Sequence, residues 1–223
     1  GYPLHKAVMF VGEGSNGKST YLQLVTEILS RENVVGKSLQ ELCYSRFAAS
    51  ELYHKLANIY PDIPKTAIRE TGVFKALTGE DFISSDRKFK SSIAFVNYAK
   101  LMFSANELPE VTDMTYAFWR RWLVVEFPNK FPENPRFFEE MFTEELIEKI
   151  IVLSLLAFRN VYNARRFSVE LSEADFKEKW LRNASSIYNY VKTGLEEGWL
   201  LLANIFYYFT YRDKPLFNWV KGV

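Results

Sequence analysis

Residues 12–19 read GEGSNGKS, a run of residue types suited to holding a phosphate group. Its glycines let the backbone curl so that successive N–H groups point at one anion. Lys18 would bring a positive charge to the outer phosphates, and the hydroxyl of Ser19 is a small neutral ligand suited to Mg²⁺. The helix that we expect to open at residue 18 would direct its positive end at the same anion. The pattern predicts binding of a nucleoside triphosphate and leaves the reaction open.

Two further polar residues come at the ends of expected strands. Asp62 closes the strand at 56–63 and could hold Mg²⁺, or it could be a turn acid between two prolines. Asn106 ends the strand at 100–106, where ligands of an open α/β sheet bind, and its amide could hold the attacking water. It could equally begin the turn that leads to Pro109. No residue is assigned as the general base.

An arginine pair and a basic run complete the candidate residues. Arg120 and Arg121 lie between aromatic residues, so they could be stacked structural cations or arginine fingers that complete a neighbouring subunit's site. Residues 81–98 suggest a hairpin with a charged tip, where Arg87, Lys88, Phe89 and Lys90 could contact DNA or form a solvated turn. The net charge of +1 gives no bulk attraction for nucleic acid, so any such binding depends on a local patch.

Alternating strands and helices must position these residues. We expect an α/β fold with a mostly parallel central sheet flanked by helices, followed by a helical C-terminal portion. The expected strands are 6–11, 56–63, 100–106 and 122–127, and the expected helices are 19–30, 47–55 and 65–77. Three prolines within 128–135 mark a change of character, after which helical spacing continues through 138–157 and 172–197.

Composition narrows the class of protein. The chain has 223 residues, 48% of them hydrophobic, which is enough for a globular core. One cysteine and two histidines exclude an internal disulfide and a zinc site of the usual kind. Residues 1–11 lack the basic start, long apolar run and cleavage site of a signal peptide, and the apolar stretch 199–211 is too short to span a bilayer. We expect no membrane association and a cytoplasmic location, in a prokaryote or a virus-infected host cell, and we expect a fragment of a longer protein.

The order of these parts resembles the superfamily-three helicase domain of phage, plasmid and poxvirus-type primase-helicases. The resemblance covers about 120 residues, in GEGSNGKST, KLANIYPDIP, TGVFKALTGEDFISSDRKFKSSIAF and AKLMFSANELPEVTDMTYAFWRRWLVVEFPNKF. It implies an AAA+-like P-loop NTPase fold, a ring that is most often a hexamer, and ATP-driven 3′-to-5′ movement along single-stranded or forked DNA. It also implies a primase module upstream of this chain.

The same resemblance implies a role for each candidate residue. The nucleotide contacts would be Gly12, Gly14, Ser15, Asn16, Gly17, Lys18, Ser19 and Thr20, with ATP and Mg²⁺ as ligands. Ser19 and Asp62 would hold the metal, and Asn106 falls on the polar sensor of the terminal phosphate. Arg121, with Arg120 beside it, falls on the arginine-finger position, and residues 87–90 fall on the DNA-contacting hairpin. Many relatives place two adjacent acids or a Glu where this chain has Pro61-Asp62-Ile63, so the general base stays open.

The predicted domains are a P-loop ATPase and helicase core at 1–131, a helical subdomain at 132–198 and a tail at 199–223. The tail looks like the start of a winged-helix segment that stops too early to be complete. The resulting hypothesis is a DNA helicase motor of a mobile-element or viral replication protein. Two rivals remain, a small-molecule P-loop kinase and a nucleotide-dependent assembly or remodelling ATPase that does not unwind DNA.

Overall fold

The computed structural model describes residues 3–167 and 173–196 of the chain. The chain divides into two compact units, residues 1–177 and residues 178–223. The predicted domain boundaries at residues 131 and 198 stay predictions. The segment 199–223, predicted as the start of a winged-helix segment, lies outside the described residues.

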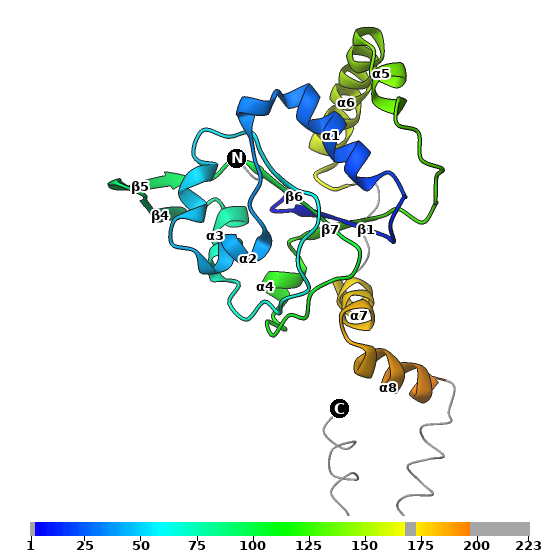
Figure 1. Ribbon diagram of the computed structural model, residues 1–223. Coiled ribbons are helices and arrows are strands. Elements are labelled where there is room, and N and C mark those ends of the chain that lie inside the picture. Colours follow the sequence, from blue (N-terminus) through cyan, green and yellow to red (C-terminus); the bar gives the residue numbers. More distant parts are fainter. Residues whose placement is uncertain (1–2, 168–172, 197–223) are drawn as a thin grey trace, which may run out of the picture. The chain divides into compact units, whose positions relative to one another are not determined.

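A five-stranded parallel sheet forms the centre of the first unit (Figure 1). Its order is β2-β3-β6-β1-β7, and every neighbouring pair is parallel. The strands are β1 (Ala7–Val11), β2 (Val34–Val35), β3 (Ala57–Tyr60), β6 (Lys100–Ala105) and β7 (Trp122–Glu126). The predicted α/β fold with a mostly parallel sheet is therefore confirmed. Apolar runs such as AVMFV form its strands because a parallel sheet is covered on both faces.

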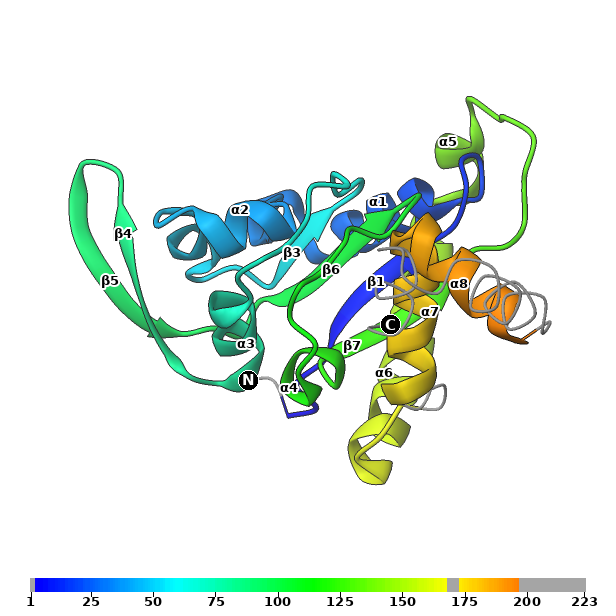
Figure 2. The same ribbon diagram turned by 90° about the horizontal axis from the view of Figure 1, so that it is seen from below.

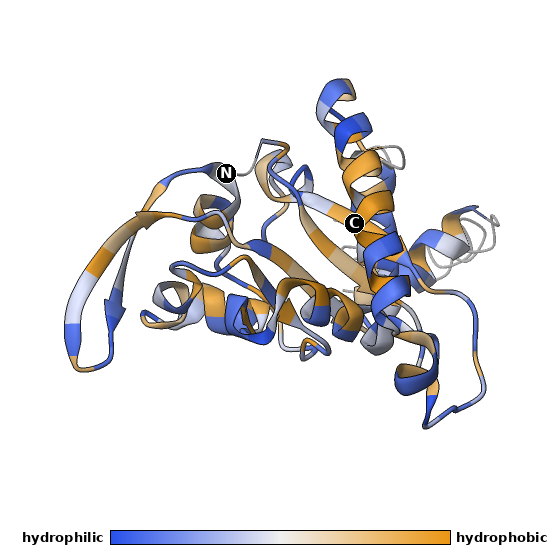
Figure 3. Cartoon of the chain, turned by 90° about the horizontal axis from the view of Figure 1, so that it is seen from above, coloured by the Kyte–Doolittle hydropathy of each residue, from blue (hydrophilic) through white to orange (hydrophobic). Residues whose placement is uncertain are grey.

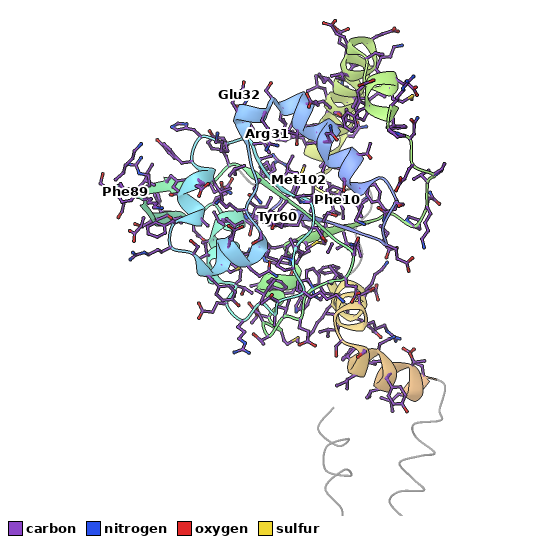
Figure 4. The ribbon with its side chains drawn as sticks, in the orientation of Figure 1. Phe10, Arg31, Glu32, Tyr60, Phe89 and Met102 are labelled. Carbon is purple, nitrogen blue, oxygen red and sulfur yellow. The ribbon has the colours of Figure 1, made fainter. Side chains whose placement is uncertain are left out.

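Helix α1 (Lys18–Leu29) covers one face of this sheet. Its buried Leu22 packs in a core cluster with Phe10 of β1 and Ile59 of β3, and Met102 of β6 borders that cluster. Figure 4 labels Phe10 and Met102 beneath the helix ribbon. The helical spacing of apolar residues in 19–30 thus predicted the helix and the face that it buries.

Two predicted helices differ in the structure. Residues 47–55 form only a short 3₁₀ helix, η2 (Ala48–Leu52), and a short helix that the sequence did not suggest, α2 (Leu39–Tyr44), precedes it. The helix expected at 65–77 begins only at Gly72, as α3 (Gly72–Gly79). The residues before it are not helical: Ile68 forms an isolated parallel bridge with Val111, with Ile68 N donating to Glu110 O at 2.8 Å. Helical spacing over 65–77 could not reveal this distant partner.

The predicted hairpin is present as β4 (Phe82–Arg87) and β5 (Lys90–Val96), and it extends away from the central sheet (Figure 2). Strand β4 is bound to the segment that contains η2: Ser85 Oγ accepts from Ser50 N at 3.1 Å, and Asp86 N donates to Arg46 O at 3.1 Å. In Figure 3 the end of the hairpin is mostly hydrophilic, whereas the central strands are hydrophobic.

The remaining described elements are helical; those after residue 135 were predicted from the sequence, whereas η1 and α4 were not. They are η1 (Arg31–Asn33), α4 (Tyr116–Trp119), α5 (Phe137–Met141), α6 (Glu144–Ala164), α7 (Glu173–Ala184) and α8 (Ser186–Glu196). The expected helix at 172–197 is therefore two helices. In the parts of the chain that the structure describes, no helix has both the length and the apolar character of a membrane span.

Candidate functional site

The carboxyl ends of four neighbouring strands gather the polar candidates at one edge of the sheet. Strand β1 leads into the glycine-rich loop 12–17, β3 leads to Asp62, β6 leads to Asn106 and β7 leads to residues 127–131. The strands are parallel, so all four segments leave the sheet on the same side. Ile63 N donates to Ser104 O at 2.8 Å and fixes the segment with Asp62 beside the end of β6.

The glycine-rich loop depends on its glycines at two points. Gly17 precedes α1 with φ 87°, a left-handed conformation that side chains rarely adopt. A Cβ on Gly12 would lie 2.4 Å from both Asn16 Nδ2 and Phe127 O, so only glycine fits there. The backbone at Gly12 therefore packs closely against Asn16 and Phe127, and the loop leads directly into the amino end of α1, where the helix dipole is positive.

Lys18 is the centre of the hydrogen bonds at this loop and is only 5% exposed. Its ammonium donates to Asn16 Oδ1 and to Asn106 Oδ1, each at 3.1 Å, and to Glu13 O at 3.2 Å; it also bonds Gly12 O. Burial lowers the pKa of Lys18, and the charge of Asp62 acts in the opposite direction. The structure therefore brings Lys18, Asn106 and Asp62, separated by up to 88 positions in sequence, to one place.

Ser19 and Asp62 are both exposed at this edge. Ser19 lines a cavity of 500 Å³ between α1 and the ends of β2 and β3, together with Tyr60 and Pro61, the two residues before Asp62. A hydroxyl and a carboxylate are oxygen ligands of the kind that Mg²⁺ takes, with phosphate oxygens and water completing its six positions. The donor chemistry of these two residues therefore fits a magnesium ion.

The two arginines lie at the opposite, amino edge of the sheet, because they directly precede β7. The carbonyl of Arg121 accepts from Ala7 N, at the start of β1, at 2.7 Å. One copy of the chain therefore does not bring either arginine to Lys18. The predicted grouping of Lys18, Asp62 and Asn106 is seen within one chain, and the arginines are excluded from it.

The environments of the two arginines differ. Arg121 is 8% exposed, and its Nη1 donates to Ala117 O. Burial and then the neighbouring Arg120 lower the pKa of Arg121, whereas Asp81 raises it. Its Nε is buried without a hydrogen-bond partner among the described residues. Arg120 is only half-buried. The structural-cation interpretation therefore fits Arg121, whereas Arg120 is the more accessible of the pair.

The hairpin tip is a separate candidate site. Lys88 and Phe89 form the turn, so strand alternation does not fix their directions. Phe89 is 94% exposed with φ 58°, and Lys88 Nζ lies 5.4 Å from the centre of its ring. Arg87 Nε donates to Ser91 O at 3.0 Å. In Figure 4 Phe89 lies at the far end of the hairpin, well away from Phe10 and Met102 on the sheet.

Sequence reasoning missed the segment after β7, residues 127–131, which we name the strap. Asn16 Nδ2 donates to Phe127 O at 3.2 Å, and Phe131 N donates to Ser15 O at 2.8 Å. Lys130 forms a 2.6 Å ion pair with Glu13. The prolines of this region indicated only a boundary. No pattern in the sequence could have found the strap, because its place beside the loop follows from β7 lying next to β1 in the sheet.

The fold and this edge define a mixed α/β protein with a glycine-rich loop at the carboxyl ends of its strands. The chain belongs to DUF5906, a family of unknown function, which matches residues 10–121. The match extends from β1 to Arg121 and ends before the strap.

Individual relatives are distant. The chain is 29% identical over 145 residues to the protein named "Putative helicase L207/L206" of Acanthamoeba polyphaga mimivirus, covering 62% of this chain and 15% of that protein. The A form apo structure of the NrS-1 C-terminal region has 17% identity and a TM-score of 0.52, with 98% of this chain and 52% of that chain covered. The A form apo structure of NrS-1 residues 305–718 has 22% identity and a TM-score of 0.45, with 66% and 33% covered. The likeness with a TM-score of 0.52 supports the mixed α/β fold.

Proposed function

We propose that this chain is the motor part of an ATP-dependent DNA helicase with an AAA+-like P-loop core. The observation that carries the proposal is the contact between Lys18 Nζ and Asn106 Oδ1, at 3.1 Å, beside the glycine-rich loop. A cation and an amide that meet at the amino end of a helix suit the terminal phosphate of a nucleoside triphosphate. The mimivirus relative, whose name describes a helicase, supports the choice of reaction.

The reaction would be attack of water on the terminal phosphorus of ATP, with the bond to the bridging oxygen of ADP breaking. Backbone N–H groups of residues 12–20 would bind the phosphates, and Lys18 would offset the charge that develops on the transferred group. Asn106 would orient the water or the terminal phosphate. Ser19 and Asp62 would hold Mg²⁺, which supplies further positive charge at the phosphate oxygens.

A ring, most simply a hexamer, would complete the site. The arginines lie at the amino edge of their own sheet, so only a second copy could bring one to the phosphates at the carboxyl edge. Arg120 is the better candidate for that role, because Arg121 is buried and bonded to Ala117 of its own chain. We further propose 3′-to-5′ movement and an upstream primase module in the full-length protein.

The DNA contact would be the hairpin tip. Arg87, Lys88 and Lys90 supply three cations within the four residues of the tip that also carries the exposed ring of Phe89. Cations bind phosphates of single-stranded or forked DNA, and an exposed aromatic ring can stack on a base. Hydrolysis at the sheet edge would move this tip and the strand that it holds.

The test is ATP turnover with and without single-stranded DNA, for the parent and for Lys18→Ala. Lys149→Ala is the matched control, because Lys149 is an exposed lysine on α6 that pairs only with Glu145 among the described residues. We expect DNA-stimulated turnover in the parent and the control, and loss of turnover in a folded Lys18→Ala variant.

Other outcomes favour the rival hypotheses. Turnover that DNA leaves unchanged would favour a remodelling ATPase, and phosphate transfer to a small acceptor in place of water would favour a kinase. Parental turnover in a folded Lys18→Ala variant would contradict the nucleotide site itself.

A further inference from the structure

A cavity of 820 Å³ lies beside the glycine-rich loop, on the side away from Asp62. One wall is formed by Gly17 of the loop and by Thr20 and Tyr21 of the first turn of α1. The other lining residues belong to the strap and to the segment that follows it, including Phe131 and Phe142. The volume is within the range of small-molecule sites, about 300 to 1,000 Å³.

The strap is held to the loop by groups that the phosphate chemistry does not use. Phe131 N donates to Ser15 O, Asn16 Nδ2 donates to Phe127 O, and Lys130 pairs with Glu13. These contacts fix the backbone of Phe131 next to the residues that would hold the phosphates. The strap side of the cavity is therefore held in place next to the loop. It lies outside residues 10–121, which the family matches.

The Phe131 ring is poorly covered for its size. It is 56% exposed, and it lies over Gly17, where an added Cβ would be 3.9 Å from the ring carbon Cε2. Tyr21, which also lines the cavity, is 42% exposed and packs edge-on against Phe10, with ring centres 5.3 Å apart. Among the aromatic residues that line the cavity, Phe131 is therefore the most exposed and offers the largest ring surface beside the loop.

We infer that this cavity binds the purine base of the nucleotide and that Phe131 stacks on that base. The inference rests on the proposed nucleotide site, and it adds the part of the ligand that the phosphate loop does not recognise. A flat aromatic base is the portion of a nucleoside triphosphate that gains from an apolar, aromatic-walled cavity. The hydroxyl of Thr20 and the amide of Asn129, which also line the cavity, offer hydrogen bonds to the sugar or to the base edge.

Phe131 then decides how much the base contributes to affinity. Stacking of a base on an aromatic side chain is worth about 1–3 kcal/mol, which corresponds to roughly a 5- to 150-fold change in dissociation constant. Inorganic triphosphate has no base, so its binding should not depend on Phe131. The ratio of the two affinities therefore isolates the cavity from the phosphate loop.

The experiment titrates ATP and inorganic triphosphate, each with Mg²⁺, into the parent, Phe131→Ala, Phe131→Tyr and Lys18→Ala by calorimetry. Phe82→Ala is the control, because Phe82 is an exposed phenylalanine at the base of the hairpin. We expect Phe131→Ala to weaken ATP binding by about fivefold or more and to leave triphosphate unchanged, whereas Phe131→Tyr and Phe82→Ala bind both ligands as the parent does. Lys18→Ala should weaken both.

The outcomes separate the two proposals. If Phe131→Ala binds ATP as tightly as the parent, the cavity is not the base site, while the phosphate loop stands. If it weakens ATP and triphosphate equally, Phe131 acts only by supporting the loop and the inference is wrong. If the parent binds neither ligand, the proposed nucleotide site is wrong and the base site falls with it.

Discussion

The two adjacent arginines should respond in opposite ways to replacement by alanine. Arg121 is buried and donates to Ala117 O, and the charge of Asp81, just before the hairpin, acts to raise its pKa. Loss of a hydrogen bond made by a charged group costs about 1.5–3 kcal/mol. Its guanidinium also packs at Gly79, where a Cβ would lie 3.3 Å from Nη2. We therefore expect Arg121→Ala to lower the free energy of unfolding by about 2–3 kcal/mol.

Replacement of Arg120 should leave the fold intact and remove turnover. Arg120 is half-buried, so Arg120→Ala should change the free energy of unfolding by less than about 1 kcal/mol. If Arg120 reaches the terminal phosphate of a neighbouring copy, its loss should slow ATP hydrolysis by about 10³- to 10⁵-fold. The two variants thus separate a packing role from a role in a shared site.

Urea denaturation measures the first quantity, and steady-state ATP turnover measures the second. A mixture of Arg120→Ala with Lys18→Ala should regain part of the activity, because some interfaces then combine an intact loop with an intact arginine. Parental turnover by Arg120→Ala would refute its role, and parental stability of Arg121→Ala would refute its packing role. Absence of rescue despite demonstrated co-assembly would contradict a site shared between copies.

Three further variants or treatments test other parts of the molecule. The double change Lys88→Ala, Lys90→Ala should keep basal ATP turnover and abolish its stimulation by DNA. The slope of log affinity for single-stranded DNA against log salt concentration should become shallower by roughly 0.7 for each phosphate that the variant no longer binds. Lys149→Ala is the control, and unchanged DNA binding by the double variant would contradict the hairpin contact. Asp113→Asn should lower the free energy of unfolding by about 2 kcal/mol near pH 7, and the difference from the parent should shrink as the pH falls below about 4; a difference that stays constant with pH would contradict the role of its charge. Burial raises the pKa of Cys43 to about 12, so a thiol reagent at about pH 8 should label it only on unfolding; rapid labelling of the native protein would contradict its burial.

The sign of the Asp113 prediction follows from its partners. Burial acts to raise the pKa of Asp113, but hydrogen bonds from Thr115, Thr71 and Lys75 outweigh burial and hold it well below the usual range. The folded state therefore favours the ionised form. Its contribution to stability is complete above the ordinary carboxyl pKa, about 4, and is lost as the pH falls through the lower pKa of the folded state.

Local sequence patterns predicted the parts of the fold that depend on local contacts. The loop at 12–17 and helix α1 follow from glycine spacing and helical periodicity, and the apolar runs correctly predicted β1, β6 and β7. The helix expected at 65–77 was wrong in its first part because Ile68 pairs with Val111, 43 positions away. No local pattern carries that information.

The candidate site likewise has a part that local patterns predicted and a part that they did not. Lys18, Asp62 and Asn106 were each predicted from residue type and strand position, and the parallel sheet brings them together. The burial that distinguishes Arg121 from Arg120 could not be read from two adjacent identical residues. The strap was missed because its recognition depends on knowing that β7 lies next to β1, which is a property of the sheet order.

The segment from Asn106 to Arg121 joins the two candidate sites through the fold. It begins at the contact with Lys18 and is fixed to the region of α3 at successive points: Val111 pairs with Ile68, and Asp113 binds Lys75 of α3 at 2.9 Å. Arg121, at its end, packs beside Gly79, the last residue of α3. Because α3 leads directly into β4, these contacts form a continuous path from the loop edge to the base of the hairpin.

Asp113→Asn should therefore be assayed for DNA-stimulated turnover as well as for stability. A purely structural role predicts that DNA stimulation survives under all conditions in which the variant is folded. Coupling along this path predicts that DNA stimulation is lost under conditions in which the variant is still folded.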